Sequence, residues 1–311
     1  MEVKNIDIGD FRGLEHLEFL ARQVVEGFIT GLHKSPYHGF SVEFSEHRIY
    51  NPGESIKNID WKLYGRTDRL YVKRYEEETN LRCRLVIDAS SSMYFPQERL
   101  GNTDKPNKIL FSAISALAIT NMLKTQRDAV GLQILGNREV STPARTTFQH
   151  HKMMNLELYK TLQAPFLNVK PEVSLAEGLH HLAQASEKRS LIVLFSDLFE
   201  FAEDEEAILD AFQHLKHQKH EIILFWTTDR KQELEFDFEA RPYRFVDMET
   251  GQKLKLNPAE AKDAYRKSMD DFKARLRLKC LQYKIDFVEA DVSEGYYAVL
   301  QSYLLKRKKM F

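Results

Sequence analysis

The stretch Leu85-Val86-Ile87-Asp88-Ala89-Ser90-Ser91-Ser92 decides the fold. Its three leading apolar residues are typical of a strand that is covered on both faces of a sheet. Asp88, Ser90 and Ser92 follow at steps of two, and their hard oxygen atoms suit Mg²⁺ or Mn²⁺ and suit zinc badly. Because ligands collect at the carboxyl ends of strands in open α/β sheets, this turn is a candidate metal site. The simpler interpretation is a serine-rich loop that caps the next helix.

After this turn the chain alternates between helical patterns and apolar runs of strand length. Further strands are predicted at 129–135, 139–141, 191–195, 222–226 and 285–288. Helices are predicted at 108–125, 149–162, 175–186, 205–217, 258–283 and 296–307. Such alternation implies parallel pairing with right-handed crossovers. We therefore expect an α/β fold in which a doubly wound, mostly parallel sheet carries helices on both faces.

The residues before the turn form an N-terminal part, residues 1–78, with a different pattern. Apolar residues recur at helical spacing over 13–32 and predict an amphipathic helix that packs on another element. The alternating segments 40–44 and 48–50 predict strands, and the proline and glycine at 52–53 indicate a turn after them. We expect this strand-rich segment to extend the sheet of the main domain.

The main domain is expected to span residues 79–311. It contains a polar insertion at about 228–257, between the strand 222–226 and the helix that begins at Pro258. Two short alternating segments in this insertion flank Thr250-Gly251, and this pattern predicts a β-hairpin.

The composition is that of an ordinary globular protein, with 311 residues, of which 43% are hydrophobic and 29% charged. The formal net charge of −1 gives no general electrostatic attraction to nucleic acid or to a membrane. Cys83 and Cys280 indicate a reducing compartment without a disulfide framework. The first residues lack an apolar signal core, and no apolar run approaches the ~18 residues that a membrane span needs. We expect a cytoplasmic protein.

Aromatic and cationic residues are interleaved in the stretch 59–75. One interpretation is a nucleic-acid surface in which rings stack on bases and cations contact phosphates. The residues that would form it are Trp61, Arg66, Arg69, Lys73 and Arg74. Acidic residues lie in the same stretch, however, and favour an edge of paired strands held by salt bridges, with Trp61 as a buried anchor.

A second predicted strand, 191–195, also leads to a carboxylate, Asp197. In a doubly wound sheet Asp88 and Asp197 can face one crevice, which strengthens the metal-site interpretation. The alternative is a Mg²⁺-dependent phosphohydrolase with Asp88 as nucleophile. Such an enzyme needs a second aspartate two residues later as acid and base, and Ser90 holds that position. A serine hydrolase is not indicated either, because no glycines flank Ser90 or Ser92 as a nucleophile elbow requires.

The pattern Asp88-x-Ser90-x-Ser92, the long helix after it and Asp197 together resemble the metal-ion-dependent adhesion site of von Willebrand factor A domains. The segment before this pattern resembles the signature of a bacterial family catalogued as domain of unknown function fifty-eight. That signature is carried by Arg48-x-Tyr50-x-Pro52-Gly53, Ile59-Asp60-Trp61, Arg66 and Leu70-x-Val72-Lys73. The likeness extends from about Tyr37 to the final helix.

The resemblance implies a von Willebrand factor A-like, Rossmann-type fold and a protein-interaction module that is not an enzyme. In such a module a divalent cation, Mg²⁺ or Mn²⁺, keeps an open position for an acidic side chain of a partner. Members of the family are commonly encoded beside MoxR-type AAA+ ATPases. The implied role is therefore a chaperone-like adaptor whose partner is such an ATPase or its client, and neither nucleic acid nor a membrane.

The resemblance also implies which residues hold the metal: Asp88, Ser90, Ser92 and Asp197, with Ser174 as a further ligand. A domains usually supply a threonine before the helix that precedes the second aspartate strand, and Val173 stands at that position in this chain. A valine side chain cannot coordinate a metal. Either Ser174 takes over through a local shift, or the site is weak or lost.

Overall fold

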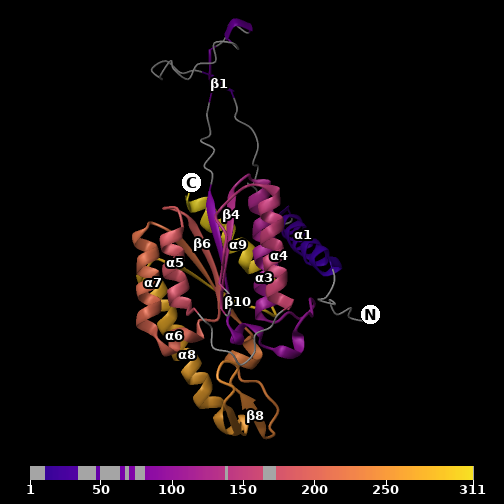
Figure 1. Ribbon diagram of the computed structural model, residues 1–311, viewed down its shortest axis with the longest axis vertical. Helices are drawn as coiled ribbons and strands as arrows, with labels where there is room; N and C mark the ends of the chain where they lie inside the picture. Colours follow the sequence, from indigo (N-terminus) through magenta and orange to yellow (C-terminus); the bar gives the residue numbers. More distant parts are fainter. Residues whose placement is uncertain are drawn as a thin grey trace. The chain divides into compact units, whose positions relative to one another are not determined.

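The computed structural model describes residues 11–33, 47–49, 64–66, 70–73, 81–136, 139–163 and 173–310 (Figure 1). The chain forms two compact units. The larger unit consists of residues 1–29 and 81–311, and the smaller unit of residues 30–80.

The smaller unit contains a two-stranded antiparallel sheet. In this sheet β1 (His47–Ile49) pairs with β2 (Tyr71–Lys73), and Arg48 lies opposite Val72. The sequence predicted that the strands of this segment extend the main sheet. For β1 and β2 that prediction is wrong, because each strand has its backbone partner in the other and they form a sheet of their own. The predicted strand 40–44 lies outside the described residues.

The aromatic and cationic stretch 59–75 is described only in part. Arg66 is exposed in a short helical turn at 64–66, and Lys73 ends β2. Trp61, Arg69 and Arg74 lie outside the described residues. The nucleic-acid interpretation of this stretch therefore stays a prediction.

The larger unit is built on a six-stranded sheet in the order β10-β7-β6-β3-β4-β5. Its parallel strands are β3 (Arg82–Ala89), β4 (Ala129–Gly136), β6 (Leu191–Ser196), β7 (Glu221–Thr228) and β10 (Asp286–Asp291). The short β5 (Val140–Ser141) pairs antiparallel with β4. Because β3 lies between β4 and β6 and both faces are covered, every residue from Cys83 to Ala89 is buried. The predicted α/β fold with a mostly parallel sheet is confirmed.

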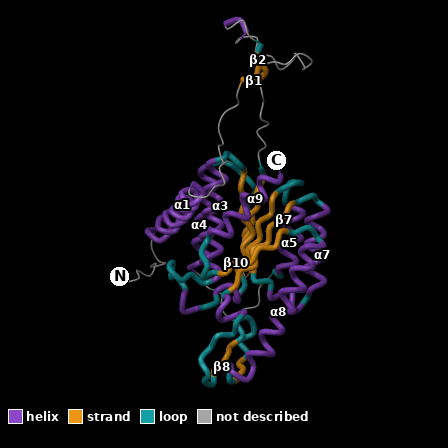
Figure 2. The backbone as a smooth tube through the Cα atoms, turned by 180° about the vertical axis from the view of Figure 1, so that it is seen from behind, coloured by secondary structure: helices purple, strands orange, loops and turns teal. Residues whose placement is uncertain are grey.

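Helices cover both faces of this sheet (Figures 1 and 2). One layer consists of α1 (Phe11–His33), α3 (Lys108–Thr125), α4 (Phe148–Gln163) and α9 (Tyr297–Met310). The other layer consists of α5 (Leu175–Ala185), α7 (Glu205–His217) and α8 (Pro258–Gln282). The helix α3 is buried on nearly all sides because it lies between the sheet and the helices α4 and α9. None of the described helices combines the length and the apolar character that crossing a membrane requires.

The helix α1 packs on α4 in the larger unit. Leu14 and Leu17 are buried on one face, as the amphipathic pattern predicts. Asn155 of α4 donates a hydrogen bond to Glu18 at 2.8 Å. The sequence placed this helix with the strand-rich segment in residues 1–78. In the structure its apolar face is covered by the α/β unit, so its first turns group with that unit.

Short helical elements lie in the loops that follow β3 and β6 at the carboxyl end of the sheet. The turns η2 (Ser91–Tyr94) and η3 (Gln97–Arg99) stand between β3 and α3, and α6 (Phe199–Glu203) follows β6. The sequence did not indicate α6, because five residues are too few for a helical period to show.

The insertion between β7 and α8 begins with a single π-helical turn, η4 (Arg230–Leu234). It continues with β8 (Tyr243–Val246) and β9 (Lys253–Leu256), which pair antiparallel in a sheet of their own. The hairpin predicted within 228–257 is confirmed. Since η4 leaves β7 at the carboxyl end of the sheet, the insertion stands at the same end as the turn after β3.

Candidate functional site

The turn after β3 gathers the three oxygen-bearing side chains that the sequence singled out. Asp88 is buried, with 6% of its surface exposed, and its Oδ1 accepts a hydrogen bond from the backbone N–H of Ser90 at 2.9 Å. The hydroxyls of Ser90 and Ser92 are hydrogen-bonded to each other, with their oxygens 3.1 Å apart. Neighbouring ligands around an octahedral Mg²⁺ are separated by about 3 Å. The two hydroxyls therefore have the spacing of adjacent metal ligands.

The adjacent strand end brings a fourth polar side chain that the sequence analysis missed. The strands β3 and β6 are parallel, with Ile87 opposite Phe195, so Ser196 ends β6 beside Asp88. The hydroxyl of Ser196 donates to Asp88 Oδ2 at 2.5 Å and accepts from the backbone N–H of Leu198 at 2.9 Å. Both oxygens of the Asp88 carboxylate thus have hydrogen-bond donors. The register of two parallel strands is the signal that identifies Ser196.

Asp197 follows Ser196 and acts electrostatically on Asp88. Burial, and next the negative charge of Asp197, raise the pKa of Asp88 from its ordinary 3.8 to about 6. Asp197 is also buried, and its Oδ1 accepts from the backbone N–H of Phe199 at 3.2 Å. The structure therefore brings the two carboxylates together at one edge of the sheet, as their positions at two strand ends predict.

Lys108, the first residue of α3, extends into this cluster and is fully buried. Its Nζ donates to Asp197 Oδ2 at 2.8 Å and also to Glu233 Oε1. Burial alone would lower the pKa of Lys108, but the attraction of the two carboxylates outweighs it and holds that pKa above its usual value. The sequence analysis identified Lys108 only as the start of a helix. No local pattern reveals that an ammonium group at this position is buried.

Glu233 belongs to η4 and links the cluster to the insertion. Its Oε2 accepts from the backbone N–H of Asp229 at 2.7 Å, and Asp229 Oδ2 is paired with Arg99 of η3 at 2.6 Å. Burial raises the pKa of Glu233 even though Lys108 opposes that shift. The network therefore joins the loop after β3, the start of α3, the end of β6 and the turn after β7.

The charges of this network do not balance. It contains four carboxylates, those of Asp88, Asp197, Asp229 and Glu233, and two cations, Lys108 and Arg99. With all six groups ionised, the negative charges exceed the positive ones by two. Because uncompensated buried charge is unfavourable, the cluster favours either protonation of a carboxylate or a bound divalent cation.

The donor set fits a hard divalent cation at Asp88, Ser90 and Ser92, while two of the expected ligands have other partners. Lys108 donates to one oxygen of Asp197, and the backbone N–H of Phe199 donates to the other. Ser174 caps α5, where its hydroxyl accepts from the backbone N–H of Glu177 at 3.1 Å. Within the described residues, no group of three or more His, Cys, Asp and Glu side chains is arranged to hold a metal ion. A metal at this edge would therefore depend on the serine hydroxyls.

The start of α5 nevertheless lies beside the end of β6. The backbone N–H of Leu175 donates to Glu200 of α6 at 2.8 Å, and α6 begins two residues after Asp197. Ser174 is thus brought to the same edge of the sheet, with Val173 next to it in the chain. In the structure the hydroxyl of Ser174 caps α5, so Ser174 would have to give up this cap to act as a metal ligand in place of the usual threonine.

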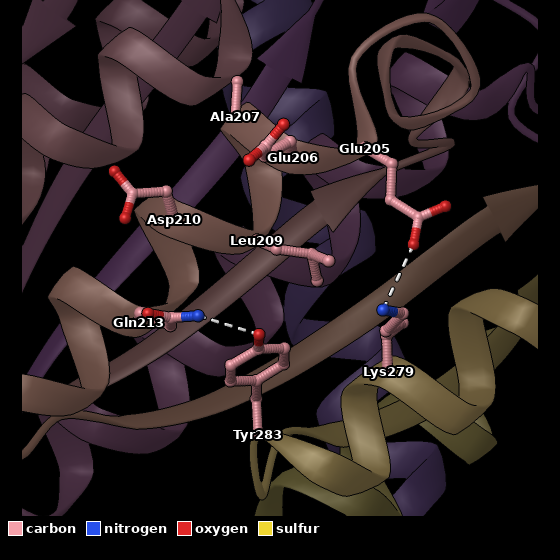
Figure 3. Close-up of a pocket in the computed structure, with 8 residues that line it drawn as sticks. All are labelled: Glu205, Glu206, Ala207, Leu209, Asp210, Gln213, Lys279 and Tyr283. Atoms are coloured by element: carbon pink, nitrogen blue, oxygen red, sulfur yellow. Dashed lines mark hydrogen bonds and ion pairs between the residues drawn. The ribbon is translucent and has the colours of Figure 1, made fainter.

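A separate groove of about 660 Å³ lies between α7 and α8 (Figure 3). Its polar lining comes from Glu205, Glu206, Asp210, Gln213, Lys279 and Tyr283. Two contacts bridge the helices across it: Gln213 donates to the Tyr283 hydroxyl at 2.8 Å, and Lys279 lies 3.4 Å from a Glu205 oxygen. The groove is lined by neither Asp88 nor Asp197, so it is distinct from the cluster at the sheet edge.

The family described as "Protein of unknown function DUF58" matches residues 46–277 of this chain. The chain belongs to the DUF58 family. The matched range includes Asp88, Lys108, Asp197 and Glu233, so the whole cluster falls within the DUF58 region.

Curated relatives of this DUF58 chain come from mycobacteria. They are Uncharacterized protein Mb1516 of Mycobacterium bovis and Uncharacterized proteins MT1527 and Rv1480 of Mycobacterium tuberculosis. Each is 27% identical over 185 residues, which cover 59% of this chain and 56% of the relative. The chain thus spans about half the length of the curated relatives that it matches.

Two solved structures are similar at low identity. The conserved hypothetical protein BatB from Bacteroides thetaiotaomicron is 12% identical with a TM-score of 0.44, covering 74% of this chain and 99% of that one. An uncharacterized membrane spanning protein from Vibrio fischeri is 16% identical with a TM-score of 0.22, covering 72% of this chain and 96% of that one. Scores this low carry no argument, so the fold of the DUF58 chain rests on its own strand order.

Proposed function

We propose that this DUF58 chain is a von Willebrand factor A-like protein-interaction module that is not an enzyme. It presents a divalent cation, Mg²⁺ or Mn²⁺, at the carboxyl edge of its sheet to an acidic side chain of a partner. Asp88, Ser90 and Ser92 hold the ion, with Asp197 beside them and Ser174 at the edge of the site. The bound cation supplies an electrophilic position that attracts a carboxylate.

The observation that carries this proposal is the pair of serine hydroxyls 3.1 Å apart next to the buried carboxylate of Asp88. Their spacing suits adjacent ligands of Mg²⁺. The excess of two negative charges in the surrounding network equals the charge that a divalent ion would supply. Geometry and electrostatics therefore favour the same occupant.

The phosphohydrolase alternative is less well supported. An enzyme of this type pairs its nucleophilic aspartate with a second aspartate two residues later, which serves as acid and base. The position two residues later is Ser90, whose hydroxyl cannot serve as acid and base at neutral pH. We therefore propose no catalytic residue.

For the partner we put forward a MoxR-type AAA+ ATPase or a client of such an ATPase, as the family resemblance implies. A partner that uses ATP would meet this chain in the cytoplasm. The acidic residue that completes the metal belongs to that partner, and the adaptor contributes the metal and the surface around it.

The first test is direct metal binding. Purified protein is titrated with Mn²⁺, and free Mn²⁺ is followed by electron paramagnetic resonance. Wild type is expected to bind a single ion, Asp88→Ala to lose that binding, and Asp104→Ala to retain it. Asp104 is the matched control because it is an exposed aspartate in the same loop. Equal binding by wild type and Asp88→Ala would falsify the metal site.

The second test concerns the partner. Immobilised wild type and Asp88→Ala are each exposed to native lysate with Mg²⁺ and with EDTA, and the retained proteins are identified by mass spectrometry. A MoxR-type ATPase retained only by wild type and only with Mg²⁺ is the expected result. Retention by both proteins in EDTA would show that the partnership does not use the metal.

A further inference from the structure

The hairpin β8–β9 stands beyond the carboxyl end of the main sheet (Figures 1 and 2). The turn η4 leads into it, and Glu233 of that turn binds Lys108, which in turn binds Asp197. The hairpin and the cluster around Asp88 therefore belong to one end of the same unit.

One face of the hairpin packs through Tyr243 and Phe245 against neighbouring aromatic rings, while Leu254 on the same face is 61% exposed. In the register Tyr243 lies opposite Leu256 and Phe245 opposite Leu254, so these side chains share a face. The Phe236 ring lies 5.5 Å from the ring of Phe245 and 4.4 Å from the ring of Tyr265 in α8. Such aromatic contacts anchor the hairpin on α8. The opposite face is therefore presented in a defined orientation.

The other face, which we call the outer face, consists of Arg244, Val246, Lys253 and Lys255. All four side chains are exposed. Arg244 lies directly opposite Lys255, and Val246 lies opposite Lys253. Like charges directly opposite one another destabilise a pair of strands. An anionic ligand on this face would relieve that repulsion.

The cations of the outer face are also without internal counterions. Among the described residues, no ion pair or side-chain hydrogen bond involves Arg244, Lys253 or Lys255. By contrast, Arg241 just before β8 is paired with Glu239 at 3.0 Å. A cation next to the hairpin is thus paired with a carboxylate, whereas the three cations of the outer face have no such partner among the described residues.

We propose that the outer face of β8–β9 binds an acidic segment of a partner protein. The proposal deepens the proposed function, because the same partner is taken to place an acidic side chain at Asp88. Lys253 and Lys255 are two residues apart on a strand, which is about 6.6 Å. An extended peptide with an acidic residue at every second position presents carboxylates at the same interval. Val246, 44% exposed, adds an apolar contact between the cations.

A peptide suits this surface better than nucleic acid does. The cationic area is confined to three side chains of one short hairpin, whereas nucleic acid needs a longer basic track. A peptide can direct its carboxylates to the hairpin and place other residues along the sheet edge.

The test uses the full chain and a fluorescein-labelled peptide of alternating glutamate and serine, with an alternating glutamine and serine peptide as the uncharged probe. The hairpin variant is Arg244→Gln/Lys253→Gln/Lys255→Gln. Its matched control is Arg266→Gln/Lys267→Gln/Arg277→Gln, which removes three exposed cations from α8. Fluorescence anisotropy is expected to show binding of the glutamate peptide about tenfold weaker for the hairpin variant and within about twofold of wild type for the control.

Several results would overturn the proposal. If the hairpin variant and the α8 control lose the same affinity for the glutamate peptide, the binding is a general charge attraction and is not specific to the outer face. If wild type binds the glutamate and glutamine peptides equally, charge does not contribute to the binding. Tighter binding of labelled single-stranded DNA than of the glutamate peptide would assign the face to nucleic acid. Circular dichroism of the hairpin variant guards against unfolding, and its packed face is unchanged by these substitutions.

The same measurement separates this proposal from the metal site. The loss caused by the hairpin variant is expected both in Mg²⁺ and in EDTA. Asp88→Ala is expected to remove only the additional affinity that Mg²⁺ supplies. A loss of affinity in the hairpin variant without any effect of Mg²⁺ would support the outer face as a binding surface and contradict the metal-dependent module. An effect of Mg²⁺ without a loss in the hairpin variant would support the metal-dependent module and contradict the outer face as a binding surface.

Discussion

Lys108 and the lysines of β9 are the same side chain in opposite surroundings. Lys108 is fully buried, and its ammonium group is compensated by Asp197 and Glu233. Lys253 and Lys255 are exposed and have no ion pair among the described residues. A buried ammonium group is stable only beside carboxylates, whereas an exposed one keeps its hydration. The comparison shows that the cation of the sheet edge is compensated inside the protein, while those of the hairpin are left to solvent within the described residues.

Removing the buried cation should have the largest effect. Lys108→Met leaves Asp197 and Glu233 buried without their counterion, and we expect the free energy of unfolding to fall by about 4 kcal/mol. Urea unfolding measures this loss. Lys253→Met is the control and should change stability by no more than about 0.5 kcal/mol. A loss below about 1 kcal/mol for Lys108→Met would contradict the assignment of Lys108 as a structural cation.

The next largest effect is a pH dependence that originates from Asp88. Its pKa is raised from 3.8 to about 6 in the folded state, so the folded protein binds the proton more tightly than the unfolded chain does. The resulting stabilisation is present below pH 3.8 and is lost as the pH rises through 6. In EDTA, the stability of Asp88→Asn relative to wild type should therefore increase between pH 3 and pH 7, by about 3 kcal/mol.

The control for this pH dependence is Asp104→Asn, which changes an exposed aspartate in the same loop. Its stability relative to wild type should stay constant over the same range. Urea unfolding at a series of pH values measures both differences. A constant difference for Asp88→Asn as well would show that burial and Asp197 do not perturb Asp88.

A partly buried ion pair should have an intermediate effect. Arg99→Gln leaves the buried carboxylate of Asp229 without its cation, and we expect a loss of about 2 kcal/mol. Arg82→Gln is the control, because the pair of Arg82 with Glu187 is exposed and should contribute less than about 1 kcal/mol. Thermal or urea unfolding of the two variants compares them directly. Equal losses would mean that burial does not determine the value of these pairs.

The smallest expected change in the free energy of unfolding comes from the hairpin, and it is an increase. Lys255→Thr removes the repulsion with Arg244 and introduces a residue that favours strands, so we expect a gain of about 0.5 kcal/mol. In an Arg244→Gln background the gain should be smaller, because the repulsion is already absent. A double-mutant cycle of unfolding free energies measures the difference. The same gain in both backgrounds would show that the two cations do not repel each other.

Local patterns of the sequence were sufficient for most elements of the larger unit. The apolar run before Asp88 predicted the buried strand β3, and the pattern of 108–125 predicted α3 with the bounds that the structure shows. The hairpin of the insertion followed from two alternating segments around Thr250-Gly251. These predictions succeed because the period of side-chain exposure is a property of neighbouring residues.

The residues that contact Asp88 and Lys108 in the site could not be predicted from local patterns of the sequence. Ser196 contacts Asp88 through the register of two parallel strands, and Glu233 contacts Lys108 across 125 residues of sequence. The grouping of α1 with the α/β unit was also missed, since an amphipathic pattern shows that a helix packs but does not show on what.

The sequence by itself determined the order of most strands and helices, the oxygen-bearing side chains of the turn after β3 and the turn that closes the hairpin. Each of these depends on residues within a few positions of one another. Only the tertiary structure decided that Lys108 is buried between Asp197 and Glu233, and that Arg244 faces Lys255 on an exposed surface. The reason is physical: burial and electrostatic compensation depend on which distant segments meet, and identical lysines acquire opposite roles from their surroundings.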